Sequence, residues 1–258
     1  MTAEARPPPG TDDWAVVVGA TGALGTAILR RLRDVGLPVV AVARSAETLE
    51  ALGADDPGVI PCAADIGTDE AIAALRAAVP GFARMVVHVA GLPVGGPLET
   101  VDLSLVTRAV DLKVNGLLRL VRGLDEHLGP GSRVVAVGGH YGFEPAPHAP
   151  LAGIANAALA NLVRQLSVVL GPRGVTVHLV APGPVETERM ERVAADAAAR
   201  RGVAAATVMD EYRAASPLGR LTTVDEVAWA VAGLLAPEAD ALHGSTLALD
   251  GGRRRTIG

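Results

Sequence analysis

Residues 14–25 decide the fold and read WAVVVGATGALG. An apolar, β-branched run leads directly into three regularly spaced glycines, and a segment with helical spacing follows. Glycines in this pattern allow a tight turn, let the backbone approach a pyrophosphate and let the helix pack closely on the strand. The free N–H groups and partial positive charge at the helix N-terminus also favour phosphate. The stretch therefore predicts a dinucleotide-binding turn rather than a purely structural one, formed by Gly19, Thr21, Gly22, Ala23, Leu24 and Gly25.

The rest of the chain continues this alternation of short apolar runs and longer helical segments. Near-continuous apolar strands separated by helices are typical of a parallel sheet that is covered on both faces. The predicted fold is α/β, a single-domain Rossmann fold with a doubly wound, seven-stranded parallel sheet and helices on both faces. We expect the strands at residues 14–18, 38–43, 58–63, 84–90, 133–138, 175–181 and 245–250, and long helices at 24–35, 70–79, 103–128 and 151–170.

Two segments depart from the alternation. Residues 1–13 contain three consecutive prolines and no apolar periodicity, so we expect a disordered arm before one domain that spans 14–258. The Ala-rich stretch 188–215 interrupts the pattern just before the last helix and strand. It follows the carboxyl end of a strand, where open α/β sheets bind ligands. We interpret it as a lid over a site, with an extra packed helix as the alternative.

Composition excludes several classes of protein. The chain has 258 residues and a net charge of −5, and its arginines are scattered except for residues 253–255, which argues against nucleic acid as a partner and favours a small-molecule substrate. The single cysteine, Cys62, excludes a disulfide framework and a multi-cysteine metal site, and we predict no metal. No apolar leader or membrane span is evident, so we expect a cytoplasmic protein. Lys113 is the only lysine and is expected on a solvent-exposed helix face.

The end of the second predicted strand indicates which dinucleotide binds. An NAD site usually has an acidic residue there, to bind the ribose 2′-hydroxyl. Residues 43–45 read Ala-Arg-Ser, and the planar guanidinium of Arg44 could pair with a 2′-phosphate. We therefore predict NADP(H) as the cofactor, while a solvated loop arginine is the alternative.

Further motifs follow the other predicted strands. They are Asp65-Ile66 after the third strand, His88 to Gly91 at the end of the fourth, Asn115 in the next helix, Pro182 to Thr187 after the sixth, and the closing segments 217–220 and 249–252. With the glycine turn, these motifs resemble those of the short-chain dehydrogenase/reductase family over nearly the whole chain. The resemblance implies a homodimer or homotetramer, assembled through the helix that carries residues 152–170. It also implies cofactor contacts at Asp65, Ile66, Ala90, Gly91, Asn115, Asn156, Pro182, Gly183, Val185 and Thr187, of which Thr187 would hold the nicotinamide carboxamide.

The sequence departs from this family at the residues that carry its reaction. The family uses a Ser at the end of the fifth strand and a Tyr-x-x-x-Lys motif on the next helix. Here the strand ends in Gly138-Gly139, and the helix aligns Ala152 with the Tyr and Asn156 with the Lys. Another register does not restore the pair, because the only tyrosines are Tyr141 and Tyr212 and the only lysine is Lys113. The resemblance is therefore to an atypical member.

Other residues near these strand ends are candidates for the chemistry. Tyr141, His140 and His148 share the loop after the fifth strand and could donate a proton, although the tyrosine could instead pack on the lid and the histidines could be solvated. Asn115 and Asn156 could bind ribose or an ordered water, or be satisfied amides, and His88 is interpreted as a neutral core histidine. We predict an NADPH-dependent reductase acting on an activated C=O, C=N or C=C group. The alternatives are a redox-neutral dehydratase, cyclase or isomerase, and a catalytically silent NADP-binding sensor.

Overall fold

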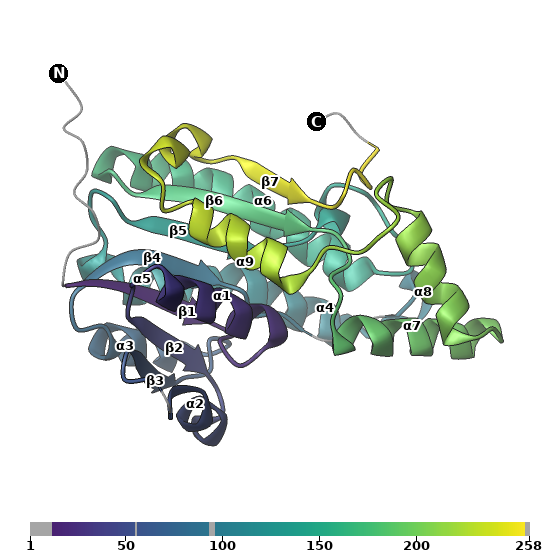
Figure 1. Cartoon of the computed structure of the whole chain (residues 1–258), viewed down its shortest axis with the longest axis horizontal. Coiled ribbons are helices and arrows are strands. Elements are labelled where there is room, and N and C mark those ends of the chain that lie inside the picture. The colour runs from purple at the N-terminus through teal and green to yellow at the C-terminus, as the bar shows by residue number, and fades with distance from the viewer. Residues whose placement is uncertain (1–11, 55, 93–95, 256–258) are drawn as a thin grey trace.

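A parallel sheet of seven strands runs through the protein (Figure 1). The computed structural model describes residues 12–54, 56–92 and 96–255. The strand order is β3-β2-β1-β4-β5-β6-β7, and every neighbouring pair is parallel. This confirms the predicted fold. The strands are β1 (Asp13–Val18), β2 (Val39–Ala43), β3 (Val59–Ala63), β4 (Phe82–His88), β5 (Arg133–Val137), β6 (Thr176–Pro182) and β7 (Thr246–Leu249).

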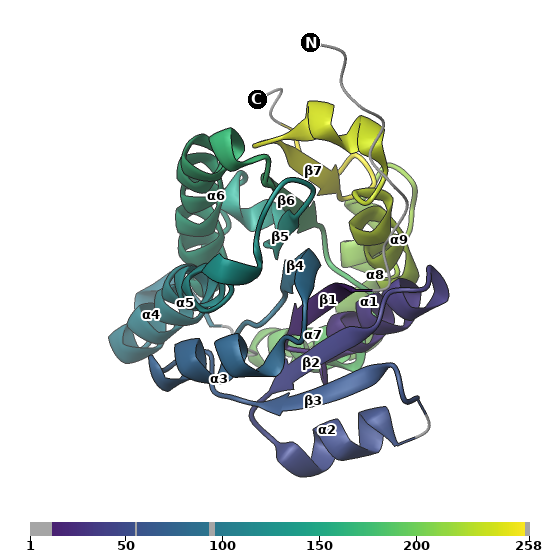
Figure 2. The same ribbon diagram turned by 90° about the vertical axis from the view of Figure 1, so that its left-hand side faces the viewer.

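Helices cover both faces of the sheet, as Figure 2 shows. One face carries α3 (Glu70–Ala78), α4 (Leu103–Val110), α5 (Gly116–Gly123) and α6 (Pro150–Leu170), and the other carries α1 (Ala23–Asp34), α2 (Ala46–Gly53) and α9 (Val224–Gly233). The alternation of side chains along β1 explains the two layers. Val16 and Val18 point into the core beneath α3, α5 and α6, whereas Ala15 and Val17 point into the core beneath α1 and α9.

The predicted long helix over residues 103–128 is interrupted. It consists of α4, a π-helical turn at Asp111–Asn115, α5 and a final 3-10 turn at Asp125–His127. A π turn adds one residue to the helical repeat, so side chains after it point about 100° away from where a regular helix would place them. This local change determines which of Lys113 and Asn115 faces the sheet.

The stretch 188–215 forms a pair of helices, α7 (Glu188–Arg201) and α8 (Ala205–Ala214). The pair lies beyond the carboxyl ends of the strands, at the right-hand end of the molecule in Figure 1. Ala194 and Ala198 of α7 pack on Val208 of α8, and these small side chains let the two helices approach closely. Its position agrees with the predicted lid, and the lid function stays a prediction. The predicted arm lies outside the described residues apart from Asp12 and Asp13, and β1 begins at Asp13.

In the described part of the chain, one segment is long and apolar enough to cross a membrane by length and composition alone. It consists of α6 and the 3-10 turn that follows it, Pro150–Arg173. Leu159, Leu162, Val163 and Leu166 of this helix belong to the core that lies against the sheet. The segment therefore packs as the core helix of this fold.

Candidate active site

The glycine turn between β1 and α1 has the shape of a phosphate cradle. Gly19 adopts φ +88°, and a Cβ at this position would lie 3.0 Å from the backbone nitrogen of Ala90. A Cβ on Gly25 would overlap the carbonyl oxygen of Gly19, so both positions require glycine. Gly22 is the N-cap of α1, and the first turn has neither a capping side chain nor an acidic residue. Its N–H groups therefore remain available for an anion, which fits a dinucleotide pyrophosphate.

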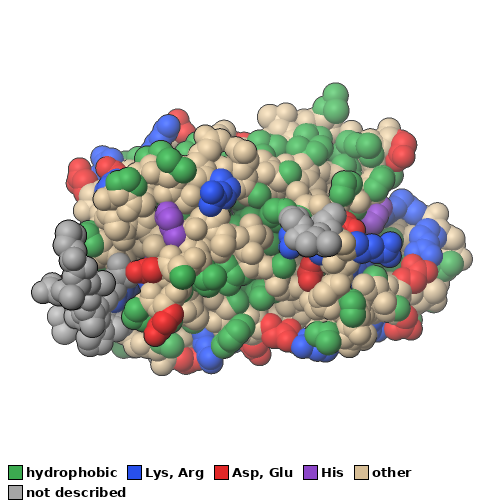
Figure 3. All heavy atoms as spheres, turned by 90° about the horizontal axis from the view of Figure 1, so that it is seen from above, with side chains coloured by type: hydrophobic (Ala, Val, Ile, Leu, Met, Phe, Trp, Pro, Cys, Tyr) green, Lys and Arg blue, Asp and Glu red, His purple; other side chains and the backbone are tan. Residues whose placement is uncertain are grey.

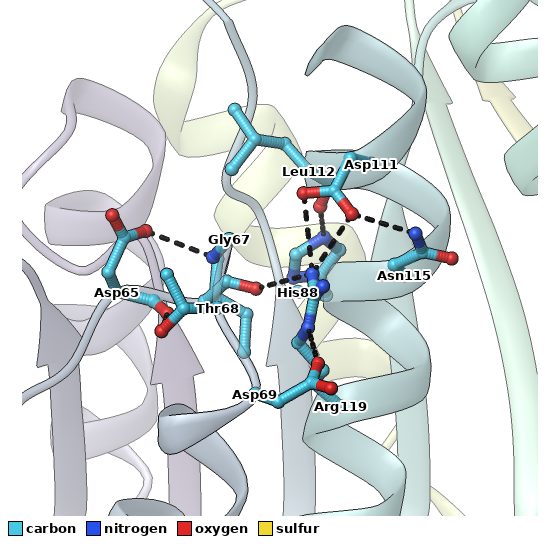
Figure 4. Close-up of polar contacts among 10 residues, drawn as sticks. Asp65, Gly67, Thr68, Asp69, His88, Asp111, Leu112, Asn115 and Arg119 are labelled. Atoms are coloured by element: carbon cyan, nitrogen blue, oxygen red, sulfur yellow. Dashed lines mark hydrogen bonds and ion pairs between the residues drawn. The ribbon is translucent and has the colours of Figure 1, made fainter. Parts of the chain in front are cut away.

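The residues expected near the adenosine differ in what they can contact. Arg44 is exposed just beyond β2 and has no hydrogen bond or ion pair within the described residues, so its guanidinium is free to bind. Asp65 is also exposed, and its Oδ1 accepts a hydrogen bond from Gly67 N at 2.9 Å (Figure 4). The Ile66 side chain is 4% exposed and packs in the core, so a cofactor contact at this residue stays a prediction for its backbone. Only its backbone could face a cofactor.

The ends of β4, β5 and β6 form the opposite half of the site. Ala90 and Gly91 follow β4, Gly138 and Gly139 follow β5, and Pro182 and Gly183 close β6. Val185 pairs in a short parallel bridge with Thr222, which fixes the start of the connection to α7. Thr187 is the N-cap of α7, where its Oγ1 accepts from Met190 N at 3.3 Å. These motifs meet at one edge because the strands are parallel.

Asn156 of α6 carries a buried acceptor at this edge. The residue is 6% exposed, and its Oδ1 has no partner among the described residues. A Cβ on Gly139 would lie 2.9 Å from Asn156 Nδ2, so the amide fills the space that a side chain at position 139 would need. An unpaired buried amide oxygen costs free energy that a donor on a ligand can recover. This orphaned oxygen fits a hydroxyl group of a bound nucleotide.

Asn115 does not reach this site, contrary to its predicted role. Its side chain is exposed, and its Nδ2 donates to Asp111 Oδ1 at 2.7 Å. Arg119 donates to the same carboxylate at 3.2 Å and also pairs with Asp69, as Figure 4 shows. Asn115 therefore belongs to a surface network. The prediction came from the family resemblance, and residues 111–115 form a π turn in which Asn115 lies on the surface.

Lys113 faces the strand ends instead, and the expectation of solvent exposure was wrong. The lysine is partly buried, and its Nζ donates to the carbonyl oxygen of Val137, the last residue of β5, at 2.7 Å. A Cβ on Gly91 would lie 3.5 Å from this nitrogen. Burial, and then the like charge of Arg189, lower the pKa of Lys113 to about 8. The site thus contains an amine that sequence reasoning missed.

His88 is a core residue, as predicted. It is fully buried, and its ring Nε2 lies 2.9 Å from Leu112 O. Burial, and then the positive charge of Lys113, lower its pKa to about 3, so the imidazole is neutral at physiological pH. The ring fixes the position of the π turn that presents Lys113.

The three predicted proton donors lie together but are poorly suited to that function. His140 is 4% exposed, and burial is the main cause that lowers its pKa to about 4, so it is neutral near pH 7. Burial likewise raises the pKa of Tyr141 to about 12. The Tyr141 hydroxyl lies 3.2 Å from Nε2 of His148. The partial burial of the imidazole and the positive charge of Arg253 lower the pKa of His148. The structure brings these three loop residues into contact, but the low pKa of His140 corrects the expectation that it donates a proton near neutral pH.

A basic cavity opens beside this cluster. It has a volume of about 570 Å³ and lies against α7, α8, His148 and the segment after β7. Basic side chains gather at this end of the molecule in Figure 3. No group of three or more metal-ligating side chains converges in the cavity or elsewhere in the described residues. The lining includes Arg189, Arg192, Arg200, Arg201 and Arg253, together with Asp196, Glu211 and Tyr212.

This arrangement can be compared with known proteins. Residues 19–254 match a family model described as enoyl-(acyl carrier protein) reductase. The chain belongs to the short-chain dehydrogenase/reductase family. Membership agrees with the nucleotide-binding turn, the strand order and the motifs at the strand ends, and it makes the protein an oxidoreductase.

Individual relatives are similar along nearly their whole length. Short-chain reductase protein NovJ of Streptomyces niveus is 31% identical, with 93% of each chain covered. The NADPH-dependent reductase BacG of Bacillus subtilis is 22% identical over 94% of this chain and 98% of its own. Among solved structures, an actinorhodin polyketide ketoreductase with NADPH has a TM-score of 0.87 and 28% identity, covering 96% of this chain and all of that chain. The protein is thus a reductase of this family.

Proposed function

We propose that the protein is an NADPH-dependent reductase that acts on an activated C=O, C=N or conjugated C=C group without a tyrosine proton donor on α6. One observation carries the proposal. The chain has both the nucleotide-binding glycine turn and Thr187 at the N-terminus of α7, the two features that bind the dinucleotide in this family. In contrast, α6 carries Ala152 and Asn156 and has no tyrosine or lysine along its length. A site that keeps the means to bind a nicotinamide but lacks the family's proton donor suits a substrate that needs little help with protonation.

Several features support NADPH over NADH. The free guanidinium of Arg44 lies beyond β2, where an acidic residue would favour NADH. BacG is named as an NADPH-dependent reductase, and the actinorhodin ketoreductase structure contains NADPH. When bound, NADPH supplies a hydride. The glycine turn would hold its pyrophosphate, Asn156 Oδ1 would accept from a ribose hydroxyl, and Thr187 would orient the carboxamide.

The missing tyrosine sets the requirement on the substrate. A positioned general acid contributes about 10²- to 10⁴-fold to the rate, which corresponds to roughly 3 to 5 kcal/mol of barrier. An iminium group already carries its positive charge, and a ketone beside a phenol can receive an internal proton. For such substrates the residues at the strand ends need mainly to orient the acceptor and exclude water.

Cofactor binding is the first test. Purified protein is titrated with NADPH and, in parallel, with NADH, following nicotinamide fluorescence. We expect NADPH to bind at least 10-fold more tightly, and Arg44→Ala to remove this preference because the 2′-phosphate loses a bidentate partner. Arg122→Ala, on the exposed face of α5, is the matched control and is expected to change neither affinity. Equal affinities in the unmodified protein would contradict the assignment of NADPH.

Turnover is then measured with activated imines, enones and hydroxyaryl ketones. Oxidation of NADPH by at least one class supports the reductase. Tight NADPH binding without oxidation by any class would instead favour the sensor or a redox-neutral enzyme. The Tyr141–His148 pair, with 3.2 Å between hydroxyl and ring nitrogen, is the group that a redox-neutral reaction would use.

A further inference from the structure

Lys113 is an enclosed amine at the strand ends that donates a hydrogen bond to a main-chain carbonyl. It is the only lysine of the chain, and its Nζ lies between the end of β5, where it donates to Val137 O, and Gly91 just after β4. No carboxylate pairs with it among the residues that the structure describes. A desolvated ammonium without a carboxylate costs stability. Such an arrangement is typical of a functional group.

We propose that Lys113 donates the proton in the reduction of a carbonyl substrate, a role that in this site lies on the π turn after α4 rather than on α6. The inference rests on the proposed function. The carbonyl carbon gains the hydride that the reduced nicotinamide loses, and the carbonyl oxygen gains a proton from the Lys113 ammonium. The neutral amine then recovers a proton from water.

The surroundings of Lys113 suit proton donation near neutral pH. The charged and titratable groups that face it are Arg189 from α7 and His88 from β4. Burial disfavours the charged ammonium, the positive charge of Arg189 disfavours it further, and the neutral His88 offers no compensating negative charge, so the pKa of Lys113 falls to about 8. The ammonium form dominates below that pH and is a far stronger acid than an ordinary lysine. Efficient general acids have pKa values close to the working pH.

The single lysine permits a direct test. Protein labelled with ¹⁵N-lysine contains one Nζ, so its titration can be followed by NMR without assignment. We expect a midpoint near pH 8 rather than the usual 10.4, and a change in this signal when NADPH is added. A midpoint at 10 or above would overturn the proposal.

Variants then separate proton donation from structure. We expect Lys113→Met to bind NADPH within about 3-fold of the unmodified protein but to reduce an activated ketone that has no neighbouring hydroxyl group 10²- to 10⁴-fold more slowly. In the unmodified protein we expect the rate to decrease above pH 8, where Lys113 loses its proton. Lys113→Arg keeps the charge but has no transferable proton near neutral pH, so we expect its rate to be low and independent of pH around 8. Unchanged turnover by Lys113→Met would refute the role of Lys113 while leaving the reductase intact. Failure of all forms to bind NADPH would refute the proposed function instead.

The basic cavity independently indicates the class of substrate. Five arginines and two acidic residues line it, although the chain as a whole has a net charge of −5. Arg201 forms an ion pair with Glu211, and the Arg192 guanidinium nitrogen Nη1 lies 3.8 Å from Glu188 Oε2. Arg189 and Arg253 have no carboxylate partner in the described ranges: Arg189 donates to Leu92 O and Arg253 donates to Tyr212 O. The guanidinium of Arg253 also lies 5.4 Å from the centroid of the Tyr212 ring.

We infer that this cavity binds an anionic oxygen group of the substrate, a carboxylate or a phosphate. Partial burial and the like charge of Arg192 lower the pKa of Arg189, so an anion would relieve repulsion among these guanidinium groups. Arginine forks match carboxylate and phosphate oxygens in geometry. Arg189 lines the cavity and its charge acts on Lys113, and His148, which also lines the cavity, contacts Tyr141. A substrate whose anionic group is held in the cavity would therefore place its remaining atoms at the strand ends.

Matched ligands test this inference without any turnover. Binding of benzoate, phenyl phosphate and neutral benzamide is measured by calorimetry on the NADPH-free protein. We expect at least one anion to bind 10-fold or more tightly than benzamide, and its affinity to fall 10-fold or more in Arg253→Gln and Arg189→Gln but not in Arg122→Gln. The tighter anion distinguishes a carboxylic acid from a phosphate-bearing substrate. Equal binding of benzamide would overturn the inference, and NADPH affinity, measured separately, tests the proposed function.

Discussion

At the level of single residues, the candidate site depends on a few positions where the surrounding atoms leave no room for a different side chain. Gly139 and Asn156 fit each other, since a side chain at position 139 would displace the amide. The helix α6 has no lysine, and Lys113 reaches the end of β5 from the π turn. The rings of Tyr141 and His140 pack on each other at a centroid distance of 3.9 Å. These residues come from three separate segments, the loop after β5, the helix α6 and the π turn, which the sheet brings together at the carboxyl ends of its strands.

The glycine turn predicts a sharp difference between two glycine substitutions. In Gly25→Ala the new Cβ overlaps the Gly19 carbonyl, so we expect loss of NADPH binding and a fall of roughly 1 to 3 kcal/mol in the free energy of unfolding. Gly233→Ala, at the exposed end of α9 with open space around it, is the control. We expect it to be neutral or to stabilise by up to about 1 kcal/mol. Fluorescence titration and urea denaturation measure both effects, and intact binding in Gly25→Ala would contradict the phosphate cradle.

The buried histidines predict a loss of stability in acid. Burial lowers the pKa of His88 to about 3 and of His140 and His178 to about 4. The unfolded chain takes up these protons near pH 6.5 while the folded protein does not, so stability is complete above that pH and falls below it. At pH 5 we expect each histidine to cost about 2 kcal/mol. Urea denaturation at pH 7.5 and 5 measures the slope, which His88→Asn should reduce, and equal stability at both values would refute the prediction.

At the scale of elements, two departures from regularity create the site. The π turn between α4 and α5 directs Lys113 inward and Asn115 outward. The α7–α8 pair encloses the basic cavity and is held together by Ala194, Ala198 and Val208 and by the Arg201–Glu211 ion pair. Because the ion pair is about half exposed, the apolar contacts provide most of the attachment.

The helix pair can be tested separately from the rest of the fold. Val208 is 2% exposed in the contact between α7 and α8, so Val208→Asp buries a charge and should release α8. We expect protease cleavage within residues 202–204 and weaker benzoate binding, with a small change in Tm because the sheet is untouched. Val203→Asp, at an exposed position in the same connection, is the control. A large drop in Tm for Val208→Asp would show that the pair is integral to the core.

At the scale of the whole molecule, the outer face of α6 suggests how chains assemble. Val168 and Val169 are 71% and 66% exposed, although the opposite side of the same helix forms core. Adjacent exposed valines on a long helix are typical of a contact surface. This face agrees with the homodimer or homotetramer that the sequence predicts, which remains a proposal.

Assembly can be tested by charge. Val168→Glu combined with Val169→Glu would place two carboxylates in a symmetric contact, so we expect the oligomer to dissociate and light scattering to report a smaller particle. Val35→Glu, at an exposed position just after α1, should leave the mass unchanged. A monomer in the unmodified protein, or an unchanged oligomer in the double variant, would exclude this face as the interface.

Local sequence patterns were sufficient to predict the sheet, its parallel strands and the nucleotide-binding turn. Apolar runs and glycine spacing are local properties, and Trp14 to Gly25 carry them without help from distant residues. The same local reasoning identified His88 as a core histidine and placed Tyr141, His140 and His148 on one loop after the fifth strand. The departures of α6 from its family were also readable directly, since they are matters of residue identity.

The side chains that face the strand ends could not be predicted from such patterns, because their orientation depends on how distant segments pack together. A π turn has no clear signature in the residues Asp111 to Asn115, and it exchanged the orientations expected for Lys113 and Asn115. The pKa values of Lys113 and His140 depend on burial and on charges brought from other segments, and the basic cavity combines α7, α8 and residues after β7. Desolvation and charge proximity are properties of three-dimensional packing, so sequence spacing alone could not supply them.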